Sequence, residues 1–238
     1  MPVNGFQNLD SKRQNRWLIY ALGSGWGHLN RAIALARKAS QPVEILVNSP
    51  YATAMEAALP PHITLRRLPG DVSNRETVLT YVQNWLADTP ADCLIVDTFP
   101  RGLMGELVRI LPLLKQPCIL IHRDLNPHYV KVKQIADFVQ QHYDHILIPE
   151  EVSVPLQHLP RAHYTAPWLL RDADELVTVR ASLRDRLQLP TDQPLIIVCA
   201  TGRPDELAMF GELTRILSQQ YRTCTVCCLA AQLPPGCP

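Results

Sequence analysis

A glycine-rich segment near the start of the chain carries the residues best suited to chemistry. It reads GSGWGHLNR over residues 23–31, with glycines at every second position and a histidine directly after the third. Glycines allow a tight turn and a close approach of the backbone to a ligand. An imidazole changes charge near neutral pH, so it can take a proton from a substrate. The pattern predicts a binding turn at Gly23, Gly25 and Gly27 with a candidate base, His28, beside it.

The helix expected after this turn gives an electrostatic reason to bind an anion. Its first N–H groups and the positive end of its dipole would point at the turn, which suits a phosphate. The role of His28 stays open, because an imidazole here either acts as a base or only hydrogen-bonds the loop. Trp26 either stacks on a sugar ring or packs over the loop. Asn30 belongs to the same segment and is a candidate substrate contact.

Further candidates follow the apolar runs that precede them. The run DCLIVD ends at Asp97, which would orient His28 or accept a substrate proton; the alternative is that it caps the next helix. Arg101 comes shortly afterwards, and Arg123 follows the run CILIH. Ligands of open parallel sheets bind at the carboxyl ends of the strands. We therefore predict catalytic roles for His28 and Asp97, and substrate contacts for Arg101 and Arg123.

Strand and helix patterns alternate through the first two thirds of the chain, which predicts an α/β fold: an open, mostly parallel, Rossmann-like sheet with helices on both faces. A capping box at Ser73 and Glu76 indicates the start of one helix. The predicted strands cover 16–22, 43–48, 63–68, 92–97, 118–122 and 145–149, with a short edge strand at 163–167. The predicted helices cover 28–39, 51–59, a segment after Ser73, a segment from 103 with a kink at Pro112, and 130–142.

The same pattern predicts how the chain divides. Residues 1–15 form a polar, flexible tail, and 16–170 form the Rossmann-like domain. Residues 171–193 form a linker with a helix at 175–187. At 194–238 a second α/β domain begins, with strands at 194–200 and 223–229 around a helix at 205–219. About 40 residues cannot bury enough surface to fold alone, so this second domain is incomplete.

Composition excludes several classes of protein. The 238 residues carry a net charge of +1, which gives no reason to expect a nucleic-acid partner. No apolar run reaches the length of a membrane span, and the first residues do not form a secretory signal. Seven cysteines, several inside apolar runs, fit buried thiols in the cytoplasm better than disulfides. One CxxC pair, at 224–227, has no second pair to complete a zinc site, so we expect no metal.

The segments GSGWGHLNRAIALA at 23–36 and VDTFPRGLMGE at 96–106 resemble glycosyltransferases of the GT-B fold. The likeness is to the branch that contains the N-acetylglucosaminyltransferase of peptidoglycan precursor synthesis and the galactolipid synthases. It implies an acceptor-binding first domain and a second domain for a nucleotide-sugar, usually a UDP-sugar. It also implies inverting sugar transfer without a metal or other cofactor. His28 would be the base, and Thr201, Gly202 and Arg203 would lie near the donor phosphates.

Other functions remain open at this stage. The short second domain allows a non-catalytic or truncated binding module, or a chain completed by a partner subunit that supplies the remaining C-terminal domain. The acceptor would be a small molecule or a lipid-linked one at a membrane surface. A sugar-nucleotide epimerase shares the two-domain plan. A plain dinucleotide-binding protein is disfavoured, because His28 and Asn48 stand where that fingerprint requires a glycine and an acidic residue.

Overall fold

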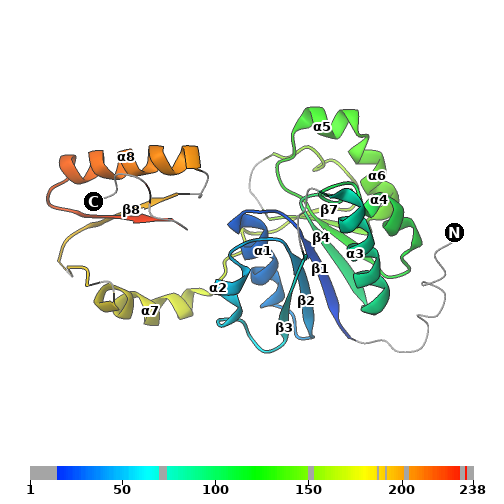
Figure 1. Cartoon of the computed structure of the whole chain (residues 1–238), viewed down its shortest axis with the longest axis horizontal. Coiled ribbons are helices and arrows are strands. Elements are labelled where there is room, and N and C mark those ends of the chain that lie inside the picture. Colours follow the sequence, from blue (N-terminus) through cyan, green and yellow to red (C-terminus); the bar gives the residue numbers. More distant parts are fainter. Residues whose placement is uncertain are drawn as a thin grey trace. The chain divides into compact units, whose positions relative to one another are not determined.

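The computed structural model divides the chain into two compact units, Met1–Leu170 and Arg171–Pro238, each of which is described by itself (Figure 1). The structure describes residues 15–69, 74–149, 153–186, 188–190, 192–200, 204–230 and 234. Most of the predicted tail, the predicted cap Ser73 and the donor-side residues Thr201, Gly202 and Arg203 lie outside these ranges.

A parallel sheet forms the centre of the first unit. In the described residues it has seven strands in the order β3-β2-β1-β4-β5-β6-β7, and every neighbouring pair is parallel. The strands at the centre of the sheet are nearly continuous apolar runs, as is typical of strands covered on both faces, and the charged residue among them is Asp97 at the end of its strand. This confirms the predicted fold class. The strands are β1 (Trp17–Ala21), β2 (Val43–Val47), β3 (Ile63–Arg67), β4 (Cys93–Asp97), β5 (Cys118–Ile121), β6 (His145–Ile148) and β7 (Ala162–Tyr164).

Helices cover the two faces of this sheet and enclose two apolar cores. On one face, α1 (Trp26–Ala36) and α2 (Ala52–Glu56) pack on side chains such as Ile19 and Ile45. On the other, α3 (Arg75–Asp88), α4 (Leu107–Ile110) and α6 (Ile135–His142) pack on side chains such as Leu18 and Leu94. The shorter α5 (Pro127–Val132) precedes α6 and has no buried residue.

Several helix limits differ from the sequence prediction. Helix α1 begins two residues before His28, with Gly25 as its N-cap. The helix predicted at 130–142 is two helices, because Gln134 adopts a left-handed conformation (φ 49°) between them. The N-cap of α3 is Asn74, whose side chain accepts hydrogen bonds from the amides of Glu76 and Thr77.

The second unit contains α7 (Ala173–Arg186), β8 (Leu195–Cys199), α8 (Pro204–Gln220) and β9 (Thr225–Leu229). The two strands form a parallel pair, and α8 packs along one face of them (Figure 1). Val198 and Leu207 are buried between strand and helix, whereas Ile197 and Leu229 remain about half exposed. Two strands and one packed helix therefore leave part of the apolar surface of this unit in water.

Candidate active site

The topology of the sheet has a switch point between β1 and β4. These strands are neighbours, but the chain proceeds from β1 toward β2 and β3, and from β4 toward β5 and β6, so the strand order reverses there. Open α/β sheets bind ligands at such a switch point, beyond the carboxyl ends of the strands. His28 follows β1 and Asp97 ends β4. The fold thus explains why two residues 69 positions apart meet.

His28 and Asp97 form a close hydrogen-bonded pair. The Nδ1 atom of His28 lies 2.6 Å from Oδ2 of Asp97. The Asp97 side chain is fully buried, and that of His28 is 18% exposed. With the Nδ1 hydrogen donated to the carboxylate, the lone pair of the imidazole lies on Nε2. The ring of Phe99 stacks on the imidazole at a centroid distance of 5.3 Å, which further restricts its orientation.

Arg31 is the third member of this cluster, and the sequence reasoning missed it. Its Nε and Nη2 atoms donate to the two oxygens of Asp97, each at 2.9 Å, and Nη2 also donates to Oγ1 of Thr98 at 3.1 Å. Residues three apart share one face of a helix, so the spacing of His28 and Arg31 on α1 was the available signal. This spacing alone does not predict a role for Arg31, because the role also requires a buried carboxylate opposite that face of the helix.

The glycines of the turn mainly make room for these side chains. A Cβ atom on Gly23 would lie 2.1 Å from Cδ2 of His28, so the imidazole occupies that space. A Cβ atom on Gly27 would lie 3.3 Å from Nη1 of Arg31. Gly25 is different: a Cβ atom there would meet only the backbone nitrogen of Gly27, at an ordinary contact distance of 4.0 Å, and its φ of −91° is available to any residue. The expectation that these glycines are needed for the backbone conformation of the turn is therefore wrong.

The amides of the turn are also used differently from the prediction. The N–H of Gly23 donates to Oδ1 of Asn48 at 2.6 Å, so this amide holds the turn to the end of β2 instead of facing a ligand. Gly25 and Gly27 are exposed at the start of α1. The anion-binding potential of the turn therefore rests on Gly25 and Gly27.

The loop after β4 is fixed by a buried network. The hydroxyl of Tyr20 donates to the carboxylate of Glu106, which also accepts from the amide of Met104 at 2.8 Å. Burial raises the pKa of Tyr20 well above its ordinary value, and the charge of Glu106 raises it further, so the phenol remains a donor. This loop contains the left-handed glycines Gly102 (φ 86°) and Gly105 (φ 82°).

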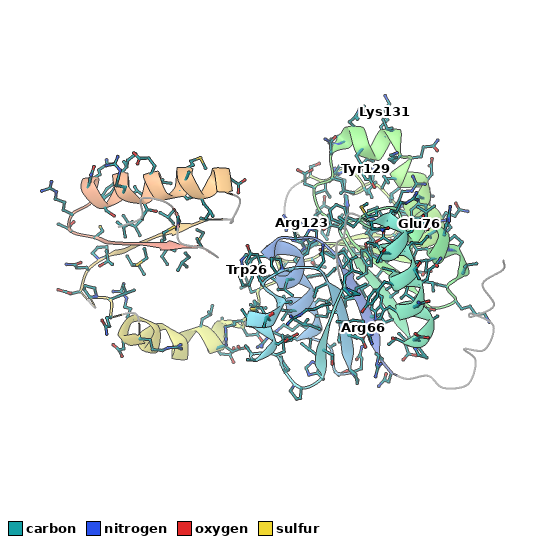
Figure 2. The ribbon with its side chains drawn as sticks, viewed as in Figure 1. Trp26, Arg66, Glu76, Arg123, Tyr129 and Lys131 are labelled. Carbon is teal, nitrogen blue, oxygen red and sulfur yellow. The ribbon has the colours of Figure 1, made fainter. Side chains whose placement is uncertain are left out.

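Trp26 is the first residue of α1 (Figure 2), and Asn30 lies one helical turn later. The indole of Trp26 stacks on the ring of Tyr51 with centroids 4.3 Å apart and an angle of 6° between the planes. One face of the indole is therefore already covered by protein. Among the described residues, the side-chain oxygen of Asn30 is buried without a hydrogen-bond partner.

The two predicted arginines have different surroundings. Arg101 donates to the carbonyl of Lys133 at 3.1 Å and lies over the ring of Phe138 at 5.0 Å, which holds it at the junction of α5 and α6. The charge of Arg123 interacts with the charges of Arg31 and Asp97. Burial lowers the pKa of its guanidinium, the charge of Arg31 lowers it further, and Asp97 opposes the change.

In the part of the chain that the structure describes, no group of three or more His, Cys, Asp or Glu side chains is arranged to hold a metal ion. No helix in the described ranges has the length and apolar character that crossing a bilayer requires.

Comparisons with known proteins agree with this architecture. No family model and no curated protein sequence matches the chain. Among solved structures, HepE from Anabaena in complex with UDP and glucose is similar (TM-score 0.55, 12% identity), covering 91% of this chain and 69% of that one. A glycosyltransferase from Rickettsia africae is similar with a TM-score of 0.53 and 7% identity. The match covers 94% of this chain and 69% of that one. UGT2 from Phytolacca americana, bound to UDP-2-fluoro-glucose and pterostilbene, is similar with a TM-score of 0.51 and 14% identity. The match covers 92% of this chain and 72% of that one.

At these identities the likeness concerns the fold. The Rickettsia africae protein is named as a glycosyltransferase, and HepE and UGT2 were solved with UDP or a UDP-sugar analogue. They extend beyond the part that this chain matches, since about 30% of each lies outside the alignment.

Proposed function

We propose that this chain is a glycosyltransferase, or the larger part of one, that transfers a sugar from a nucleotide-sugar to an acceptor hydroxyl. The observation that carries the proposal is the His28–Asp97 pair at the switch point of the sheet, 2.6 Å apart and with the carboxylate fully buried. An imidazole oriented by a carboxylate is the usual arrangement of a side chain that removes a proton from a hydroxyl. The similarity to glycosyltransferase structures supports the reaction class.

The proposed step moves one proton and one sugar group. Nε2 of His28 accepts the proton of the acceptor hydroxyl while the oxygen attacks the anomeric carbon of the donor. The bond between that carbon and the diphosphate oxygen breaks, and the nucleoside diphosphate leaves with the electron pair. Asp97 stabilises the imidazolium that forms. Negative charge develops on the leaving diphosphate, which is best stabilised by positive charge and N–H groups already in place.

The residues that would meet the diphosphate are those with exposed amides or nearby positive charge. Gly25 and Gly27 lie at the N-terminus of α1, where the helix dipole is positive. Arg123 adds a guanidinium close to Arg31 and Asp97. We propose a UDP-sugar as donor, because HepE and UGT2 were solved with UDP and with a UDP-sugar analogue. We further propose a lipid-linked acceptor, because the sequence resembles the branch that contains the galactolipid synthases.

The test measures donor binding and turnover separately on the full chain. Thermal shift with UDP, UDP-glucose, UDP-galactose and UDP-N-acetylglucosamine reports binding, and release of UDP in the presence of a panel of acceptors reports turnover. We expect His28→Asn to lower the rate of UDP release by about 10²- to 10⁴-fold while donor binding persists. His128→Asn, at an exposed histidine on α5, is the matched control and should keep the wild-type rate.

Two outcomes would contradict the transferase proposal. If the His28→Asn variant releases UDP at the wild-type rate, His28 is not the base. If NAD alone stabilises the chain and no nucleotide-sugar does, the chain is a dinucleotide-binding protein. Binding of UDP-sugars with no release of UDP, even by the wild-type chain, would instead identify a binding module that needs the rest of a C-terminal domain for catalysis.

A further inference from the structure

We propose that Arg31 is a positioning residue that fixes the carboxylate of Asp97 and balances its charge, so that His28 remains a neutral base with its lone pair on Nε2. This inference rests on the proposed function, since it assigns the residue that prepares the base for the proposed step.

The geometry of the contact supports the positioning role. Arg31 approaches Asp97 with two donors at 2.9 Å, one to each carboxylate oxygen. Such a two-point contact fixes the plane of a carboxylate, whereas one hydrogen bond would leave it free to rotate. In the fixed plane, Oδ2 also accepts from Nδ1 of His28. The guanidinium is itself held, because Nη2 donates to Oγ1 of Thr98.

Burial of the carboxylate supports the role in charge balance. Asp97 is fully buried, and a buried charge is costly unless it is paired. With Arg31 present, a permanent cation pairs with the carboxylate, and the imidazole can stay neutral. Without it, the nearest group able to supply a positive charge in direct contact with Asp97 is His28, which would do so by taking up a proton. A protonated imidazole cannot accept the proton of an acceptor hydroxyl.

A second cation near the pair acts in the same direction as Arg31. Arg123, just after β5, interacts electrostatically with both Arg31 and Asp97. Its influence reaches Asp97 through space, while the side chain of Arg31 is hydrogen-bonded to both carboxylate oxygens. Arg31 is therefore the residue whose replacement should change the state of His28 most.

Gly27 provides an independent sign that the position of this guanidinium matters. Its missing Cβ leaves space in which Nη1 of Arg31 lies, at 3.3 Å from where the Cβ atom would stand. A side chain at 27 would have to displace the guanidinium by a few tenths of an ångström. The turn and the arginine one helical turn later therefore fit one another.

The experiment reads the imidazole directly and needs neither donor nor turnover. Nitrogen-15 NMR of the histidine rings at pH 7.5 distinguishes a protonated ring nitrogen from one with a lone pair, and the His28 signals are assigned by their loss in His28→Asn. For the wild-type chain we expect hydrogen on Nδ1 and a lone pair on Nε2. In Arg31→Gln we expect hydrogen on both nitrogens. Lys38→Gln, which removes one positive charge just after α1, is the matched control and should give the wild-type signals.

A second variant separates charge from geometry and protects the test against misfolding. Arg31→Lys keeps the positive charge but cannot make the two-point contact, so we expect a neutral imidazole with the hydrogen divided between Nδ1 and Nε2. Wild-type ring signals in Arg31→Gln would overturn the proposal. If that variant does not fold, wild-type signals in Arg31→Lys would overturn the positioning role in the same way.

The rate of UDP release distinguishes a failure of this inference from a failure of the proposed function. Where UDP release is measurable, Arg31→Gln should lower kcat about 10- to 100-fold at pH 7.5 and change the KM for the donor less than about twofold. Ring signals that behave as expected in a chain with no transferase activity would reject the proposed function but leave the effect of Arg31 on His28 established. Normal activity in Arg31→Gln with changed ring signals would reject the catalytic relevance of Arg31.

Discussion

Gly23 and Gly25 are separated by a single residue, yet a side chain would meet very different surroundings at the two positions. A Cβ atom on Gly23 would overlap the imidazole of His28, at 2.1 Å from Cδ2, whereas a Cβ atom on Gly25 would make only an ordinary contact of 4.0 Å with the backbone nitrogen of Gly27. We expect Gly23→Ser to lower the melting temperature by several degrees and to displace His28. Gly25→Ser should leave the melting temperature unchanged or raise it slightly, because serine is a favoured N-cap.

Thermal unfolding followed by circular dichroism, together with NMR of the His28 ring, measures both effects. The two variants make the same chemical change, so they control for the added hydroxyl. Equal losses of stability would contradict the assignment, because they would mean that the turn itself, and not the space for the imidazole, requires glycine at both positions.

The buried His122, directly after β5, should make the free energy of unfolding depend on pH. Burial lowers its pKa from an ordinary value near 6.5 to about 4. Nε2 accepts a hydrogen bond from the amide of Leu156 at 3.2 Å, which requires the neutral ring. Between pH 6.5 and 4 the unfolded chain therefore binds a proton that the folded chain does not. Stability falls as the pH falls through this window, by at most roughly 3 kcal/mol from this group.

Urea unfolding at a series of pH values tests this expectation. His122→Gln keeps an acceptor for Leu156 but cannot be protonated, so the decrease between pH 6.5 and 4 should become smaller than in the wild-type chain. The exposed His128 is the control, and His128→Gln should leave the wild-type pH dependence intact. An unchanged slope in His122→Gln would show that other groups cause the acid sensitivity.

At the scale of secondary-structure elements, α3 depends on the cap at its first turn. The side chain of Asn74 accepts from the amides of Glu76 and Thr77 at 3.1 and 3.2 Å, which satisfies N–H groups that have no partner within the helix. Asn74→Ala should therefore destabilise the first unit by about 1 kcal/mol. Asn84→Ala, at an exposed position inside the same helix, should be neutral or slightly stabilising, since alanine is the better helix former.

Chemical unfolding of the two variants, followed by tryptophan fluorescence, to which the buried Trp85 on α3 contributes, provides the measurement. Equal midpoints for Asn74→Ala and Asn84→Ala would contradict the importance of the cap. A larger loss from Asn84→Ala would do so more strongly.

The elements also show what a sequence can and cannot reveal about the candidate site. The strands were predictable because buried parallel strands are continuous apolar runs, and β4 reads CLIVD with no alternation. The meeting of His28 and Asp97 was anticipated as a possibility from the rule on strand ends. The role of Arg31 was not, because it depends on which helix face lies opposite a carboxylate 66 residues away. The left-handed Thr98 (φ 66°) was equally hidden, since threonine seldom adopts that conformation.

At the scale of the whole molecule, the two units differ in how much apolar surface they bury. The first unit encloses cores on both faces of its sheet. In the second, the two strands and the helix α8 packed on them leave Ile197, Met209 and Leu229 at least half exposed. A two-stranded sheet is marginally stable, so we expect the second unit to unfold at a lower denaturant concentration than the first.

The cysteines divide between the units in a way that reports this difference. Burial raises the pKa of both Cys93 and Cys118, in β4 and β5, to about 12, so few of these thiols form the reactive thiolate. Burial also keeps an alkylating reagent away from both side chains. In the second unit Cys199 is exposed, and Cys227 and Cys228 are partly so. In native buffer, iodoacetamide should modify Cys199 first and leave Cys93 and Cys118 untouched.

Pulsed alkylation at increasing urea concentrations, read by peptide mass spectrometry, turns this contrast into a measurement of each unit. Modification of Cys227 and Cys228 should reach completion while Cys93 and Cys118 are still protected. A single midpoint shared by all the thiols would contradict independent unfolding.

The same experiment repeated with a bound UDP-sugar is informative for the proposed function. A ligand that binds only the folded second unit raises the midpoint of its thiols, and by mass action the rise grows with ligand concentration. Protection confined to Cys93 and Cys118 would place the nucleotide-sugar on the first unit alone.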